Sequence, residues 1–192
     1  MKALRLAFVL VILCVAAYPQ TQDLGNGAFA NEKGPIMIAV DATQAIVNMK
    51  SPYSLFILYL AAKSQNQDIV VGRNDVTLVY KGAEYKMPSV KELREKYSGE
   101  IRDVDLYSRL AAGGLVSSWI RVYDFSRRTD FFPAFRPGAP IPVDEGSMTG
   151  SIGFRTKCYF KNPGFQPGDK LIIKVRDKKN PDIASEVEVT LK

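Results

Sequence analysis

The chain has 192 residues, of which 46% are hydrophobic and 24% are charged, so it is long and apolar enough to fold around a core of its own. Its 26 basic and 20 acidic residues give a formal net charge of +6, a mild excess that permits an acidic partner but does not require one. The absence of histidine excludes Ser-His and Cys-His catalytic pairs and histidine metal sites.

The N-terminus has the pattern of a secretory signal peptide. Lys2 and Arg5 precede an unbroken apolar run at residues 6–17, as is typical of such signals. As a helix this run would span about 18 Å, which is less than the roughly 30 Å hydrocarbon core of a bilayer. The length therefore favours a cleaved signal over a retained membrane anchor.

Two positions fit the small-residue rule for signal cleavage. Cleavage after Ala17 is favoured because it follows the apolar run directly, and cleavage after Ala30 is the alternative. After removal of residues 1–17 we expect an exported protein, periplasmic or extracellular, with no transmembrane segment. Residues 18–34 are rich in Gln, Asn and Gly without periodicity, which predicts a flexible N-terminal segment.

The next part of the chain predicts β-strands. Residues 35–40 alternate between apolar and other positions, and residues 55–62 are apolar throughout. The second pattern suits a central strand buried on both faces, with a buried helical turn as the alternative. Further strands are expected at 45–49, 68–72, 76–80 and 83–87, the last two joined by a tight turn at Lys81 and Gly82.

A short helical insertion is expected at about residues 89–112. Ser89 followed by Glu92 has the spacing of a capping box, and Gly99 supplies a stop. Helical spacing of apolar residues predicts a second helix at about 102–112.

Strands then resume toward the C-terminus. The segments expected to be strands are 115–124, 151–161, 170–176 and 185–191, with a polar loop at 177–182 between the last two. Alternation is clearest at 151–161, where the basic residues fall on one face. This pattern predicts a half-buried strand with a basic outer face.

Residues 125–150 form a long loop in this prediction. Prolines at 133, 137, 140 and 142 prevent a helix or a central strand from running through it. Its first half interleaves arginine with phenylalanine, a mixture typical of binding hot spots and able to stack on bases or sugars. The candidate binding residues are Arg127, Arg128, Phe131, Phe132, Phe135 and Arg136. In the alternative interpretation, the phenylalanines pack onto the end of the core and the arginines are solvated.

Other candidate chemistry is weaker. Asp103 and Asp105 would diverge by about 200° on a helix, so they suit the helix dipole better than a metal. A calcium loop at 177–182 is opposed by its own lysines. Cys158 lies on an apolar strand face, which predicts a buried, inert thiol. We expect no metal and no cofactor.

About eight or nine short strands with one helical insertion indicate a mainly β protein, a β-sandwich over residues 35–192. Residues 165–169, followed by an alternating strand and a polar hairpin, resemble the closing strands of bacterial immunoglobulin-like modules. The resemblance covers about the last quarter of the chain. It implies an immunoglobulin-like β-sandwich, and such modules mostly serve as adhesive, spacer or binding units.

We therefore expect an exported, non-enzymatic binding or structural module of the bacterial cell envelope. Its partner would be a protein or an envelope polymer. The net charge is too small to favour nucleic acid. The alternative is an extracytoplasmic, carboxylate-dependent hydrolase. Its catalytic carboxylates would come from Asp124, Asp130, Asp144 and Glu145, which border the long loop.

Overall fold

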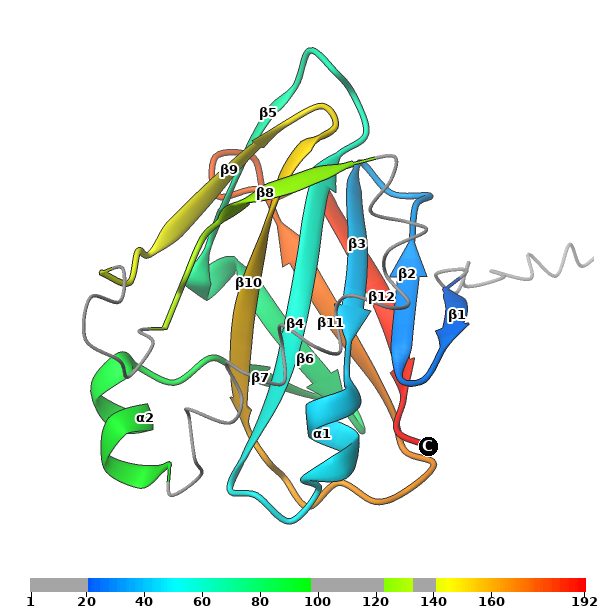
Figure 1. Cartoon of the computed structure of the whole chain (residues 1–192), viewed down its shortest axis with the longest axis vertical. Helices are drawn as coiled ribbons and strands as arrows, with labels where there is room; N and C mark the ends of the chain where they lie inside the picture. Colours follow the sequence, from blue (N-terminus) through cyan, green and yellow to red (C-terminus); the bar gives the residue numbers. More distant parts are fainter. Residues whose placement is uncertain (1–20, 98–122, 133–140) are drawn as a thin grey trace, which may run out of the picture.

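Two β-sheets pack face to face in the computed structural model, which describes residues 21–97, 123–132 and 141–192 (Figure 1). The larger sheet contains β1 (Gln22–Gly25), β2 (Ala28–Asn31), β3 (Ile36–Asp41), β4 (Tyr53–Ala62), β5 (Asp68–Gly72), β8 (Asp124–Arg128), β9 (Glu145–Thr149) and β10 (Ile152–Lys161). The smaller sheet contains β6 (Val76–Tyr80), β7 (Ala83–Lys86), β11 (Lys170–Arg176) and β12 (Ala184–Thr190). The prediction of a mainly β, two-layer sandwich is confirmed.

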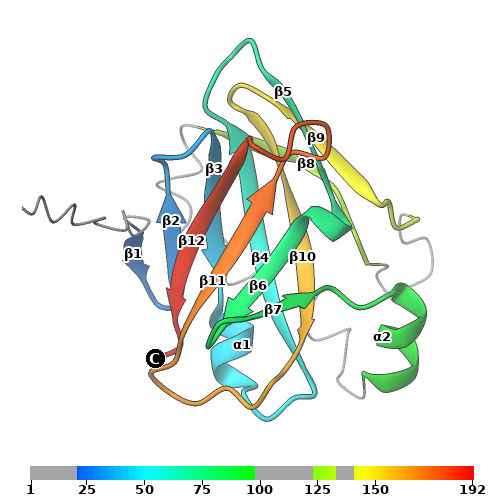
Figure 2. The same ribbon diagram turned by 180° about the vertical axis from the view of Figure 1, so that it is seen from behind.

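Neighbouring strands are antiparallel with one exception. The larger sheet has the order β1-β2-β3-β4-β10-β9-β5, and β8 runs parallel to β10 beside it. The smaller sheet has the order β12-β11-β6-β7 and lies across the larger one when the molecule is seen from behind (Figure 2). The connections are therefore a mixture of hairpins and crossovers between layers.

The core lies between the two sheets and is built from their inward-facing side chains. β4 is its centre, because β4 pairs with β3 on one side and β10 on the other and is buried at every position. This confirms the prediction of a central strand at 55–62. Side chains that meet between the layers include Ile38, Phe56, Leu58 and Phe154 from the larger sheet and Leu78, Ile173 and Val187 from the smaller one.

The outer face of the larger sheet is also buried. Ala39, Ile57 and Tyr59 pack there with Phe125 of β8, whose ring meets that of Tyr59 edge-on at 5.5 Å. Burial raises the pKa of the Tyr59 hydroxyl to about 12, because the phenolate would lose its solvation.

The strand at β10 has the predicted position, but its second face is not the exposed basic surface that we expected. Lys157 and Tyr159 lie on that face and are buried. The Tyr159 ring is covered by Phe132 at 5.1 Å and by Tyr97 at 5.6 Å between ring centroids. Periodicity within one strand cannot reveal such a cover, because it comes from distant segments.

The N-terminal segment expected to be flexible is ordered from residue 21 onward. β1 and β2 extend the larger sheet, and all four residues of β2 are buried. Asn31 Nδ2 donates to the Glu186 carbonyl at 2.6 Å, and Thr21 Oγ1 accepts from the Glu188 amide at 2.8 Å. These bonds join the segment to β12 in the other layer.

The helices differ from the prediction at one place. Residues 45–49, expected as a strand, instead belong to α1 (Thr43–Val47) and the turn after it. The helix starts where Asp41 Oδ1 accepts the Thr43 amide at 2.9 Å, and Ala45 is its buried contact. The side chain of Asp41 therefore ends β3 and turns the chain.

The predicted helix start at Ser89 is confirmed. In α2 (Val90–Lys96), Ser89 Oγ accepts the Glu92 amide at 3.0 Å. The Glu92 carboxylate accepts the Tyr53 hydroxyl at 3.0 Å, which fixes α2 against the start of β4. The second predicted helix, 102–112, lies outside the described residues, as does most of the predicted strand 115–124.

The stretch predicted as one long loop contains two strands at its ends. β8 begins at Asp124 and β9 begins at Glu145, on either side of the proline-rich part. Residues 133–140 lie outside the described part of the chain.

Within the described ranges, no helix is long and apolar enough to cross a membrane.

Candidate functional site

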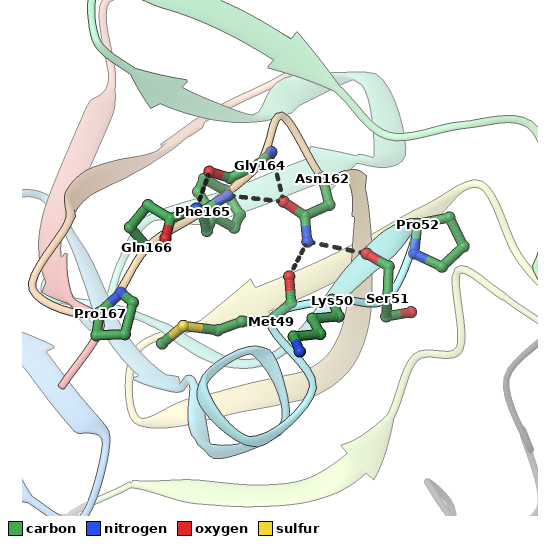
Figure 3. A pocket seen from close by; sticks show the side chains of 9 residues that line it. All are labelled: Met49, Lys50, Ser51, Pro52, Asn162, Gly164, Phe165, Gln166 and Pro167. Atoms are coloured by element: carbon green, nitrogen blue, oxygen red, sulfur yellow. Dashed lines mark hydrogen bonds between the residues drawn. The ribbon is translucent and has the colours of Figure 1, made fainter.

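A groove lies at one end of the sandwich, beside α1 and the turn that leads into β11 (Figure 3). Its volume is about 530 Å³, within the range of ligand sites, roughly 300–1,000 Å³. Its lining comes from two segments that are far apart in the sequence: Met49, Lys50, Ser51 and Pro52 from the first, and Asn162, Gly164, Phe165, Gln166 and Pro167 from the second.

Asn162 holds the two segments together. Its Nδ2 donates to the carbonyl oxygens of Met49 at 2.6 Å and Ser51 at 2.8 Å. Its Oδ1 accepts the amides of Gly164 at 2.8 Å and Phe165 at 3.0 Å. One side chain therefore fixes both walls of the groove, as the dashed lines in Figure 3 show.

The floor of the groove is Phe165, which is buried against the smaller sheet. Its ring meets the Tyr80 ring edge-on at 5.0 Å. The Tyr80 hydroxyl donates to Asp169 Oδ2 at 2.6 Å, and the same oxygen accepts the Gln166 amide at 2.8 Å. These two bonds, the Tyr80 hydroxyl first, lower the pKa of Asp169, since they stabilise its carboxylate.

The groove offers apolar walls and a polar rim. The side chain of Met49 extends toward Pro167 in Figure 3. Lys50 is the one charged residue among the nine lining residues, and no carboxylate lines the groove. Ser51 supplies a hydroxyl group to the lining, and Gln166 supplies an amide. This arrangement suits binding through apolar contact and hydrogen bonds better than acid–base chemistry.

Two of the three phenylalanines predicted to bind a partner, Phe131 and Phe132, are core residues in the structure. Phe131 and Phe132 are 0% and 1% exposed. Their rings lie 6.3 Å from Phe154 and 5.1 Å from Tyr159, respectively. The Arg73 guanidinium lies over the Phe132 ring at 5.8 Å. Their position matches the alternative interpretation, in which these side chains pack onto the core.

The other predicted binding residues are not gathered into a site by the described chain. Arg127 is exposed on β8, and Arg128 ends that strand opposite Arg155 of β10. Phe135 and Arg136 lie outside the described residues. The four that the structure describes do not line the groove. Binding by this loop therefore stays a prediction.

The carboxylates considered for a hydrolase occupy different environments. Asp144 pairs with Arg73 at 3.1 Å, and Glu145 pairs with Lys178 at 2.6 Å. The hydrogen bond from Lys178 lowers the pKa of Glu145, which is the opposite of what a catalytic acid needs. Asp130 is buried, whereas Asp124 is exposed at the start of β8. The hydrolase remains an untested alternative.

In the loop considered for calcium, residues 177–182, the first carboxylate accepts hydrogen bonds from backbone amides of the protein itself. Asp177 is buried and accepts amides from Val70 at 3.0 Å and Asn180 at 3.2 Å. It thereby ties the β11–β12 hairpin to β5. The described residues contain no group of three or more Asp, Glu or Cys side chains arranged to hold a metal ion. Burial also raises the pKa of the Cys158 thiol well above its usual value, which keeps it protonated.

Sequence reasoning missed the groove, although residues 162–164 read Asn-Pro-Gly. An Asn-Pro-Gly triplet predicts a turn, yet nothing in it reveals the contact with residues 49–52. Comparison of the chain with protein-family models, curated proteins and solved structures finds no match. The groove is therefore assigned from its own geometry.

Proposed function

We propose that this chain is an exported, non-enzymatic binding module of the bacterial cell envelope, and that its groove is the contact surface. The observation that carries the proposal is the double tie made by Asn162, which holds both walls in place. A site whose walls are already ordered loses little conformational entropy when a ligand binds. Apolar lining with a few hydrogen-bonding groups is the usual character of such sites.

The position of the groove also supports a binding role. In β-sandwich modules the loops at the ends of the sheets often carry recognition, because the sheets hold them rigidly. An immunoglobulin-like relationship is part of the same proposal. Its support is the two-layer architecture and the antiparallel β11–β12 hairpin that closes the chain.

Export is supported by the cationic start and short apolar run at residues 1–17. The alternative cleavage after Ala30 would remove β1 and most of β2, including the buried Phe29. We therefore propose that the folded domain retains this segment and that cleavage follows Ala17.

Site-specific photo-crosslinking in the host cell tests the proposal. A benzophenone amino acid is placed at Gln166, on the rim of the groove, in the full-length chain. We expect one discrete crosslinked species, because a bound partner would cover this position. Adding Lys50→Glu to the same chain reverses the one charge in the lining and should reduce its yield.

The matched control places the same probe at Lys63, which is exposed in the loop after β4, at the other end of the sandwich (Figure 1). Crosslinking at Lys63 should be absent or unaffected by Lys50→Glu. Equal crosslinking at both positions, or none at Gln166, would contradict a binding role for the groove.

A further inference from the structure

The smaller sheet has two edges that differ in their surroundings. At β12 the outer backbone groups are taken by the larger sheet: Asn31 donates to the Glu186 carbonyl, and Thr21 accepts the Glu188 amide. Among the strands that the structure describes, β7 pairs with β6 alone, and Ala83, Glu84 and Lys86 are exposed. An edge of this kind is a template for another strand.

The turn before β7 determines which of its backbone groups point outward. Lys81 has φ 48° and Gly82 has φ 80°, the left-handed pair of a two-residue type I′ turn. In such a hairpin Tyr80 and Ala83 exchange both hydrogen bonds, and Leu78 and Tyr85 do so next. The amides and carbonyls of Glu84 and Lys86 therefore face away from β6, and no hydrogen bond within the described chain uses them.

The side chains along this edge carry opposite charges at matched positions. Glu84 and Lys86 are two residues apart, so they lie on the same face of the strand, with Tyr85 between them on the inner face. If the strand meets its own copy in antiparallel register around Tyr85, Glu84 of each chain lies opposite Lys86 of the other. Opposite charges directly across an antiparallel pair are favourable.

We propose that β7 is a self-association surface, and that two copies of the chain join through antiparallel pairing of β7 centred on Tyr85. Glu84 and Lys86 of one copy then exchange backbone hydrogen bonds with Lys86 and Glu84 of the other. The two smaller sheets become one continuous sheet across the contact. This inference is independent of the groove, which lies on different residues.

The size of the contact sets its strength. Pairing of a four-residue strand buries less than the roughly 1,200 Å² that specific stable interfaces reach at minimum. The association should therefore be reversible and depend on concentration.

Sedimentation velocity of the processed chain, from about 10 to 500 µM, measures the association. We expect the weight-average sedimentation coefficient to rise with concentration. Glu84→Lys places like charges opposite each other in both halves of the contact and should weaken association roughly tenfold or more. The exchange Glu84→Lys with Lys86→Glu restores opposite charges at unchanged net charge and should restore the dimer. Lys63→Glu is the control for a charge change outside β7.

A disulfide tests the register. Tyr85 would lie opposite its own copy in a pair without mutual hydrogen bonds, where Cα atoms are about 4.5 Å apart and a disulfide can form. Tyr85→Cys should therefore give a crosslinked dimer on mild oxidation, whereas Ala83→Cys should not, because residue 83 faces residue 87 of the other chain. The native Cys158 is buried and does not interfere.

A chain that stays monomeric over the whole range would overturn the proposal. So would association that Glu84→Lys leaves unchanged, or that the charge exchange fails to restore. Crosslinking through Ala83→Cys in place of Tyr85→Cys would overturn the register.

Discussion

Asn162 uses all the hydrogen-bonding capacity that its amide has in this position. Two donors and two acceptor directions are each occupied by backbone groups of the loops that line the groove. Asparagine suits this place because one end donates and the other accepts. Aspartate would turn a carboxylate oxygen toward the carbonyls of Met49 and Ser51 and repel them.

Phe131 and Phe132 show how burial decides between two interpretations of the same residues. A phenylalanine in a proline-rich segment can contact a partner or the core, and the residue type is the same in both cases. The structure places both rings against β10, at Phe154 and Tyr159. Neither ring can contact a partner unless this part of the core opens.

We expect Phe131→Ala to destabilise the protein by about 3–5 kcal/mol, since it removes a fully buried ring and leaves a cavity. Urea unfolding followed by fluorescence or circular dichroism gives the change. Arg127→Ala is the matched control, because this exposed residue lies on β8 nearby and should change stability by no more than about 0.5 kcal/mol. Equal stability of the two variants would show that the phenylalanine is not part of the core.

At the scale of elements, the spacing of apolar residues predicted those strands whose buried faces are visible in their own sequence. The runs at β4, β6, β11 and β12 are bounded by turns and have alternating or continuous apolar residues. The same reasoning failed at α1, where the short apolar run Ala45–Val47 fits either structure. The hydrogen bond that the Thr43 amide donates to the Asp41 carboxylate accompanies that start, and its effect is not visible as a pattern.

β1 and β2 were missed for a related reason. Each is four residues long, and their sequence is rich in turn-forming residues. What stabilises them is pairing with β3 and bonds to β12, which lies more than 150 residues further along the chain. Contacts over such distances leave no local signal. The groove was hidden in the same way.

The turn between the groove and β11 makes stability depend on pH through Asp169. Its pKa is lowered in the folded state by the Tyr80 hydroxyl and the Gln166 amide. A carboxyl whose pKa is lowered by folding stabilises the protein at any pH above its unfolded-state pKa, about 3.9. This contribution is lost as the pH falls through the folded-state pKa.

We therefore expect Asp169→Asn to lower the urea midpoint at pH 7 and to have a smaller effect in acid, as the pH falls through the lowered pKa of the wild-type carboxyl. Asp182→Asn, exposed in the β11–β12 turn, is the control. An Asp169→Asn effect that is equal at pH 7 and in acid would contradict this account of the turn.

At the scale of the whole molecule, hydrogen bonds connect the two sheets at two places along their edges. Asn31 and Thr21 connect the larger sheet to β12, and Asp177 and Lys178 connect the β11–β12 hairpin to β5. Cys158 is a free, buried cysteine, so no disulfide joins the described parts of the two layers. The sandwich thus relies on its core and these hydrogen bonds.

These contacts bear on where the proposed signal peptide is cleaved. Because β1 and β2 are integral to the larger sheet, we expect the secreted chain to begin at Tyr18, with Thr21 retained to bind β12. Intact mass and N-terminal sequencing of the protein from the host envelope or medium measure this directly. A mature chain that begins at Asn31 would contradict it.

The most direct test of the central claim, that the groove is the contact surface, is amide chemical-shift mapping of the chain from residue 18 with a library of small organic fragments. Fragments collect in sites that can bind ligands, whatever the natural partner is. We expect the largest shifts at residues 49–52 and 162–167, the segments that Asn162 joins. Shifts concentrated around Arg127, or no specific shifts at all, would contradict the account.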